Sequence, residues 1–167
     1  MKKRIISMLG TMTMLCLLIA GNVLGVSAQD KEKIVDGSYL TDAEESRGTV
    51  SEDELLKGKH LMDGESDPIS KSGRGRIYAY GATTANHDVD KLAVLVYVDQ
   101  YNEETGDWEQ VYSWAKEAES TYYVSTGKTL QVPRGYYYRV HCTHYAGNVD
   151  EYPYDEAISF TDGIKVD

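Results

Sequence analysis

The sequence predicts an all-β protein, a two-sheet antiparallel sandwich of six to seven strands over residues 69–167. Short segments of this region alternate between apolar and polar residues with a period of two, as half-buried strands do. Turn-forming Gly, Pro, Asn and Asp residues separate these segments. No segment shows the 3.6-residue period of a convincing helix. About 100 residues is a usual domain size, so one core can hold the whole region.

The first 28 residues have the parts of a secretory signal peptide. Lys2, Lys3 and Arg4 precede an apolar run, and residues 26–28 (Val-Ser-Ala) are the small residues that a signal peptidase recognises. We therefore expect a secreted, extracellular protein without stable membrane insertion after cleavage; a retained membrane anchor is the alternative. Cleavage would leave 14 basic and 27 acidic side chains, a formal charge of −13. Such a surface repels nucleic acid, so nucleic acid is not an expected partner.

Residues 29–68 are expected to form an acidic, largely disordered leader. They carry 12 acidic and five basic side chains and few aromatic ones. One short helix is possible, because Ser51 and Glu54 have the spacing of a capping box before Leu55 and Leu56. Such a helix is marginal alone, so the segment is either a solvated linker or a segment that docks on the domain or on a partner.

Three strands are expected in the first half of the domain, at residues 76–83, 91–101 and 107–115. The second of these has the strongest alternation in the chain. Its predicted core face consists of Leu92, Val94, Val96 and Val98. The apolar residues of the third strand fall in two sets, and a β-bulge would reconcile them.

The second half is expected to contain strands at residues 121–132, 134–147 and about 156–166. The first is either one kinked strand or two short strands hinged at Gly127. The alternation predicts that its inward residues are Tyr122, Val124, Leu130 and Val132. In the last strand a bulge at residues 161–163 is expected, with Ile158, Phe160, Ile164 and Val166 in one phase.

The strand at residues 134–147 is predicted to be central, because aromatic and β-branched residues dominate it. One face would carry Tyr136, Tyr138, Val140, Cys142 and His144, and the other Tyr137, Arg139, His141, Thr143 and Tyr145. The spacing from Val132-Pro133 to Tyr138 is close to that of the tyrosine corner in immunoglobulin-like and fibronectin-type domains, which favours an architecture of that kind by analogy.

The chain also resembles a family of small exported proteins of Gram-positive bacteria, a domain of unknown function. The resemblance covers about residues 60–167 and rests on segments at residues 69–77, 89–91, 135–140 and 160–164, together with His144. These motifs are turns, strand phases and a bulge. The resemblance therefore implies export and an all-β fold, and it implies no catalytic residue, cofactor or partner.

No cofactor, metal site or catalytic constellation is predicted. Cys142 and His144 lie two apart on one strand face, where neighbours are about 6.5–7 Å apart, which is long for a nucleophile–base contact. A buried Cys142 is the favoured interpretation. Acidic residues gather at residues 99–107 and 150–156, and the two loops could share a calcium ion only if they emerged at one end of the sandwich.

Tyrosine provides the better functional signal, because the chain has 14 tyrosines and one phenylalanine. The predicted ligand-binding residues lie opposite the core stripes and are Tyr78, Tyr80, Tyr97 and Tyr101. Exposed tyrosine stacks on sugars and anchors protein partners, whereas cross-strand tyrosine pairs can simply stabilise a sheet. The sequence thus favours a secreted, non-enzymatic binding module for a surface glycan or protein. The alternative is a structural, self-assembling extracellular protein.

Overall fold

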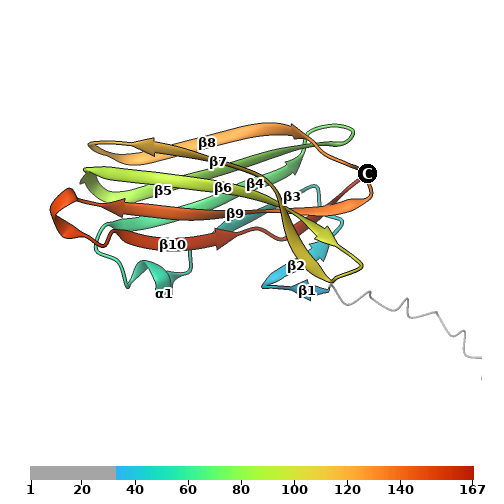
Figure 1. The fold of residues 1–167 in the computed structure, drawn as a ribbon, viewed down its shortest axis with the longest axis horizontal. Helices are drawn as coiled ribbons and strands as arrows, with labels where there is room; N and C mark the ends of the chain where they lie inside the picture. Colours follow the sequence, from blue (N-terminus) through green and yellow to red (C-terminus); the bar gives the residue numbers. More distant parts are fainter. Residues whose placement is uncertain (1–32) are drawn as a thin grey trace, which may run out of the picture. The chain divides into compact units, whose positions relative to one another are not determined.

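The computed structural model describes residues 33–167, which form two packed β-sheets, one short helix and one 3-10 turn (Figure 1). The predicted all-β sandwich is confirmed. The strands are β1 Ile34–Val35, β2 Ser38–Thr41, β3 Glu45–Thr49, β4 Leu61–Lys71, β5 Arg76–Val89, β6 Lys91–Asn102, β7 Asp107–Ala118, β8 Thr121–Gln131, β9 Tyr136–Gly147, β10 Asp155–Phe160 and β11 Gly163–Val166. Helix α1, Glu52–Leu55, follows β3, and the turn Val149–Glu151 lies between β9 and β10.

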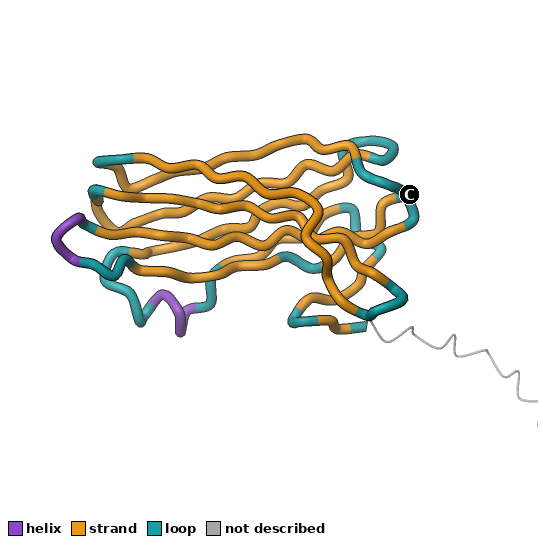
Figure 2. Tube along the Cα trace, viewed as in Figure 1, coloured by secondary structure: helices purple, strands orange, loops and turns teal. Residues whose placement is uncertain are grey.

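The large sheet has seven strands in the order β1-β2-β11-β9-β6-β7, with β10 also paired to β9, and the small sheet has four in the order β3-β4-β5-β8. Neighbours run antiparallel, except that β2 and β11 are parallel. Strand β9 lies between β6 on one side and β10 and β11 on the other, so its predicted central position is confirmed. The loops gather at the ends of the sandwich (Figure 2).

The prediction of a disordered leader is wrong for residues 33–68. Strand β3 pairs with β4, and β2 pairs with β11 near the C-terminus. Val50 and Leu61 are buried in the common core, at 4% and 6% exposure. The compact unit therefore begins well before residue 69. The acidic composition predicted disorder wrongly, because β1, β2 and β3 have only two to five residues and lie at sheet margins, where a strand needs few apolar side chains of its own.

The possible short helix in this segment is confirmed. Ser51 is the N-cap of α1, and its Oγ accepts a hydrogen bond from the Glu54 backbone N–H at 3.3 Å. Residues 1–32, which include the predicted signal peptide and the start of the leader, lie outside the described residues.

The core lies between the sheets and follows the predicted period of two. Leu92, Val94, Val96 and Val98 of β6 are at most 1% exposed. Gly81 of β5 lies at a close approach of the two layers, because a Cβ there would lie 2.7 Å from Cys142 Sγ and 2.8 Å from a Val96 methyl group. The two sheets can meet at this point only with glycine in β5.

Tyr138 of β9 is completely buried and forms the hydrogen bond of a tyrosine corner. Its hydroxyl donates to the Pro133 carbonyl oxygen, five residues upstream, at 2.8 Å, and lies 3.0 Å from Gln100 Oε1. The side chain thus ties the β8–β9 connection to the core. The predicted resemblance to tyrosine-corner domains holds at this contact.

The predicted phase of the last strand is wrong. Phe160 of β10 pairs with His141, and Ile164 of β11 pairs with Tyr138. From the first pair to the second there are four steps along β10 and β11 but only three along β9, so one residue is extra. The extra residue reverses the side-chain alternation, as one inserted residue must. Ile158 and Phe160 therefore point outward, at 53% and 42% exposure.

Three other local predictions concern β7 and β8. The bulge in β7 is confirmed, because Val98 pairs with Tyr112 and Asp99 with Gln110, which leaves Val111 unpaired. Strand β8 is one continuous strand, paired with β5 through Gly127 without a register shift. Tyr122 was expected to point inward and is 57% exposed.

Candidate binding face

The four predicted binding tyrosines do not share one face. Tyr78 and Tyr80 belong to β5 in the small sheet, whereas Tyr97 and Tyr101 belong to β6 in the large sheet. The turn at Asp90 carries the chain from one layer to the other, so the outer faces of β5 and β6 lie on opposite sides of the sandwich. A single tyrosine-rich surface over β5 and β6 is therefore excluded.

Tyr78 and Tyr80 form contacts within β5 and with β8 on the outer face of the small sheet. Their rings stack along β5 with centroids 6.4 Å apart, and across the strands the hydroxyl groups of Tyr80 and Tyr123 are 2.7 Å apart. The Tyr78 ring lies over Gly127, where a Cβ would be 2.3 Å from the tyrosine hydroxyl. Burial raises the pKa of Tyr80 to about 12. These contacts match ordinary cross-strand stabilisation of a sheet.

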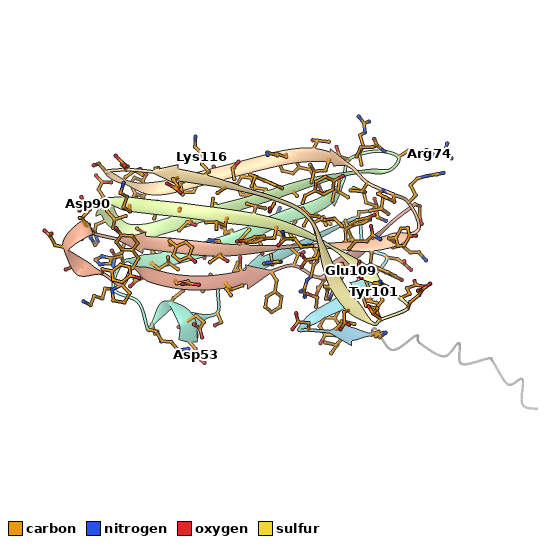
Figure 3. The ribbon with its side chains drawn as sticks, viewed as in Figure 1. Asp53, Arg74, Asp90, Tyr101, Glu109 and Lys116 are labelled. Atoms are coloured by element: carbon orange, nitrogen blue, oxygen red, sulfur yellow. The ribbon has the colours of Figure 1, made fainter. Side chains whose placement is uncertain are left out.

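Tyr101 is not available to a ligand. It is 2% exposed, and its ring packs on Trp108 with centroids 5.4 Å apart. The hairpin of β1 and β2 covers both rings: Lys33 Nζ donates to the Tyr101 hydroxyl, and Trp108 Nε1 donates to the Val35 carbonyl oxygen at 3.0 Å. Figure 3 shows Tyr101 beside this hairpin. The hairpin thus closes one end of the outer face of the large sheet.

A buried charged cluster fastens the same hairpin. Arg139 Nε donates to Asp99 Oδ2 at 3.0 Å, and His141 Nδ1 lies 2.9 Å from the same oxygen. The Arg139 guanidinium also donates to the Asp36 carbonyl oxygen at 3.1 Å and to Ser38 Oγ at 3.0 Å. Burial alone would raise the pKa of Asp99, but the hydrogen bonds and charges of His141 and Arg139 lower it. The arrangement is a structural clamp.

Beyond the hairpin, the outer face of the large sheet is open, and we call this part the open face. Three rows of side chains cross β7, β6, β9 and β10. They are Glu117-Ala93-Tyr145-Glu156, Ala115-Leu95-Thr143-Ile158 and Ser113-Tyr97-His141-Phe160. Every side chain in these rows is exposed or half-buried. The middle of the face is apolar and aromatic, and its margin carries carboxylates.

The rings of Tyr97 and His141 stack across β6 and β9 with centroids 4.5 Å apart and an interplanar angle of 11°. Because neighbouring strands are about 4.8 Å apart, rings stacked across them stand upright on the sheet. Their edges point to solvent, and one face of each ring is covered by the other. Of the four predicted residues, Tyr97 alone lies on the open face.

The other members of the open face were partly visible in the sequence. The alternation of β9 already placed His141, Thr143 and Tyr145 on its outward side. Ile158 and Phe160 were missed because the extra residue after β10 reverses the phase. The local sequence pattern does not show that β10 pairs with β9 and so extends the outer surface of β6 and β9.

Cys142 and His144 are completely buried. His144 Nδ1 lies 2.8 Å from Thr83 Oγ1, and its Nε2 lies 2.8 Å from Ser159 Oγ. Because Thr83 Oγ1 donates to the Ala93 carbonyl oxygen, it must accept from His144 Nδ1. Burial lowers the pKa of His144 to about 4 and raises the pKa of the Cys142 thiol. Both side chains are satisfied parts of the core.

The two acidic loops cannot share an ion. Asn102 pairs with Asp107 at one end of β6, whereas Lys91 pairs with Gly147 at the other, so the loops lie at opposite ends. In the second loop, Asp155 Oδ2 accepts hydrogen bonds from three consecutive backbone N–H groups, at 2.6, 2.5 and 2.9 Å. Within residues 33–167, no three or more His, Cys, Asp or Glu side chains are grouped so as to hold a metal ion.

Comparison with known proteins finds no matching family model and no significantly similar curated protein. Among the described residues, none of the helices has the length and apolar character needed to span a membrane.

Proposed function

We propose that this chain is an extracellular, non-enzymatic binding module and that the open face is its recognition surface. Export is supported by the signal-peptide pattern of residues 1–28. Recognition is supported by one observation: the open face presents Leu95 and Tyr97 on β6 and Ile158 and Phe160 on β10, on either side of Thr143 and His141 of β9, on a sheet whose other face is fully used by the core. Contiguous exposed apolar surface of this kind is typical of interaction sites.

A protein partner fits this surface better than a glycan. Sugar rings stack on exposed aromatic faces, and the stack of Tyr97 on His141 leaves one face of each ring covered. The neighbouring row is aliphatic except for Thr143, with Leu95 and the 53% exposed Ile158. Aliphatic side chains contribute to protein interfaces by burial of apolar area. The proposed ligand is therefore a protein segment.

Self-assembly is the second candidate function, and the edge of β10 favours it. Among the described strands, β10 pairs with β9 alone. Its six residues, Asp155–Phe160, contain no Lys or Pro, which are the residues that usually block edge-to-edge pairing. The edge strand β7 carries Lys116 in addition to carboxylates, whereas the charged residues of β10 are Asp155 and Glu156. Sedimentation velocity at increasing protein concentration separates the two functions, because a binding module stays at constant size.

The proposed function is tested by binding of the purified secreted protein to cell envelopes of the producing organism. Ile158→Ser removes apolar area from the open face and should weaken binding at least about five-fold. Met62→Ser is the matched control, because Met62 is similarly exposed, at 61% against 53%, and lies on the small sheet. Binding that survives Ile158→Ser unchanged would rule out the open face.

Treatment of the envelopes identifies the partner class in the same assay. Protease digestion should abolish binding, because the proposed partner is a protein. Periodate, which cleaves the vicinal diols of glycans, should leave binding intact. The opposite pattern would replace the protein partner with a glycan.

A further inference from the structure

We propose that a groove at the Tyr145 end of the open face binds a lysine or arginine side chain of the partner protein. This inference rests on the proposed function and specifies the chemistry that the open face selects.

The groove follows from the row Glu117-Ala93-Tyr145. Ala93 of β6 pairs with Glu117 on one side and with Tyr145 on the other. Two strand spacings therefore separate the larger side chains by about 9–10 Å, with only a methyl group between them. The resulting hollow has a volume of about 530 Å³ and is lined by Ala93, Leu95, Glu117, Glu119, Tyr145 and Tyr154, among others. This space is ample for one long side chain.

The charges around the groove favour a cation. Glu119 is paired with Lys91, and both side chains line the groove. Glu117 is exposed and forms no close ion pair among residues 33–167, although its charge, after the hydrogen bond and charge of Glu119, also raises the pKa of Lys91. Glu156 ends the row beyond Tyr145. The pKa of Tyr145 is raised, mainly by burial of its hydroxyl and also by the charge of Glu156 and a hydrogen bond to it. Two carboxylates and the Lys91 ammonium thus line the groove, and Glu156 adds a third carboxylate at the end of the row, so the net charge is negative and favours a cation over an anion.

The lining matches the parts of a long basic side chain. The methylene stem can lie on Ala93 and Leu95, while the charged end reaches Glu117 beside an aromatic ring. The next row places Leu95 and Ile158 about 6.5–7 Å farther along the strands, which is the distance between residues i and i+2 of an extended chain. The expected partner segment is extended, with a basic residue two positions from an apolar one.

The inference is tested with two labelled peptides and the full secreted chain. One peptide is Thr-Lys-Thr-Leu-Thr-Thr, and the matched peptide has Glu in place of Lys. Fluorescence anisotropy should show binding of the Lys peptide that weakens with added salt, and at least ten-fold weaker binding of the Glu peptide. Equal affinity for the two peptides, or no binding of the Lys peptide up to about 1 mM, overturns the inference.

Two variants locate the interaction. Glu117→Gln should weaken binding of the Lys peptide about two- to five-fold, as loss of an exposed ion pair does. Glu103→Gln is the matched control: it changes the net charge equally, lies in the loop at the opposite end of β6 and should leave the affinity unchanged. Ala93→Leu fills the groove and should weaken binding at least ten-fold. Equal effects of Glu117→Gln and Glu103→Gln refute the groove.

The envelope assay separates this inference from the proposed function. If Ile158→Ser removes envelope binding while Glu117→Gln and Ala93→Leu leave it unchanged, the cation groove is refuted and the open face stands. If Ile158→Ser leaves it unchanged, both proposals fail. Thermal unfolding of each variant checks that it is folded, and the exposed Glu117→Gln variant keeps the test decisive if Ala93→Leu does not fold.

Discussion

Replacement of Arg139 by methionine tests the clamp that fastens the β1–β2 hairpin. The side chains of Arg139 and Asp99 are 7% and 4% exposed, and they meet at 3.0 Å. Methionine keeps much of the length of the side chain and leaves the Asp99 carboxylate buried beside His141 alone. Loss of one partner from a buried ion pair costs about 3–5 kcal/mol. The hydrogen bonds to the hairpin are lost as well, so we expect the upper part of this range.

Urea unfolding followed by tryptophan fluorescence measures this effect, because the Trp108 ring lies 4.7 Å from the Arg139 guanidinium carbon. The double variant Asp99→Asn/Arg139→Met removes both charges and should regain at least about 1 kcal/mol relative to Arg139→Met. The exposed Lys116→Met variant is the control and should change the free energy of unfolding by less than about 0.5 kcal/mol.

The pH dependence of the clamp has a definite sign. The folded-state pKa of Asp99 is lowered, so its contribution is present above its unfolded pKa of about 3.9 and is lost as the pH falls through the folded value. The penalty of Arg139→Met should therefore shrink in acid. The clamp would be refuted if Arg139→Met lowered the free energy of unfolding by less than about 1 kcal/mol at pH 7. It would also be refuted if the effects of the two single substitutions simply added up in the double variant.

Three further predictions concern the core. The pKa of His144 is lowered from 6.5 to about 4, so the unfolded state binds more protons between these values and stability falls by about 3 kcal/mol as the pH drops through this window. His144→Gln cannot ionise and should flatten the urea-midpoint profile; parallel profiles would contradict this. The buried Cys142 thiol should react with a thiol reagent only after unfolding, and rapid labelling of the native protein would show it to be accessible. Tyr138→Phe removes the hydroxyl that donates to Pro133 and should cost about 1–2 kcal/mol in urea unfolding, whereas an unchanged midpoint would make the tyrosine corner energetically irrelevant.

The candidate site could be predicted only in part. Alternation identified Tyr97 on the outward side of β6 and His141 and Tyr145 on the outward side of β9. It could not show that Tyr101, in the same alternation, is covered by the β1–β2 hairpin. Lys33 and Tyr101 are 68 residues apart, and such a contact leaves no periodic signal in either segment.

The sequence by itself determined the all-β fold, most strand positions and the inward residues of β6 and β9. These depend on local alternation, because the pleat sends successive side chains to opposite faces. Only the tertiary structure decided which sheet each strand joins. That choice separated Tyr78 and Tyr80 from Tyr97, brought β1–β3 into the domain and set β10 beside β9. Sheet membership depends on backbone hydrogen bonds between distant segments, and the same alternation is compatible with either sheet.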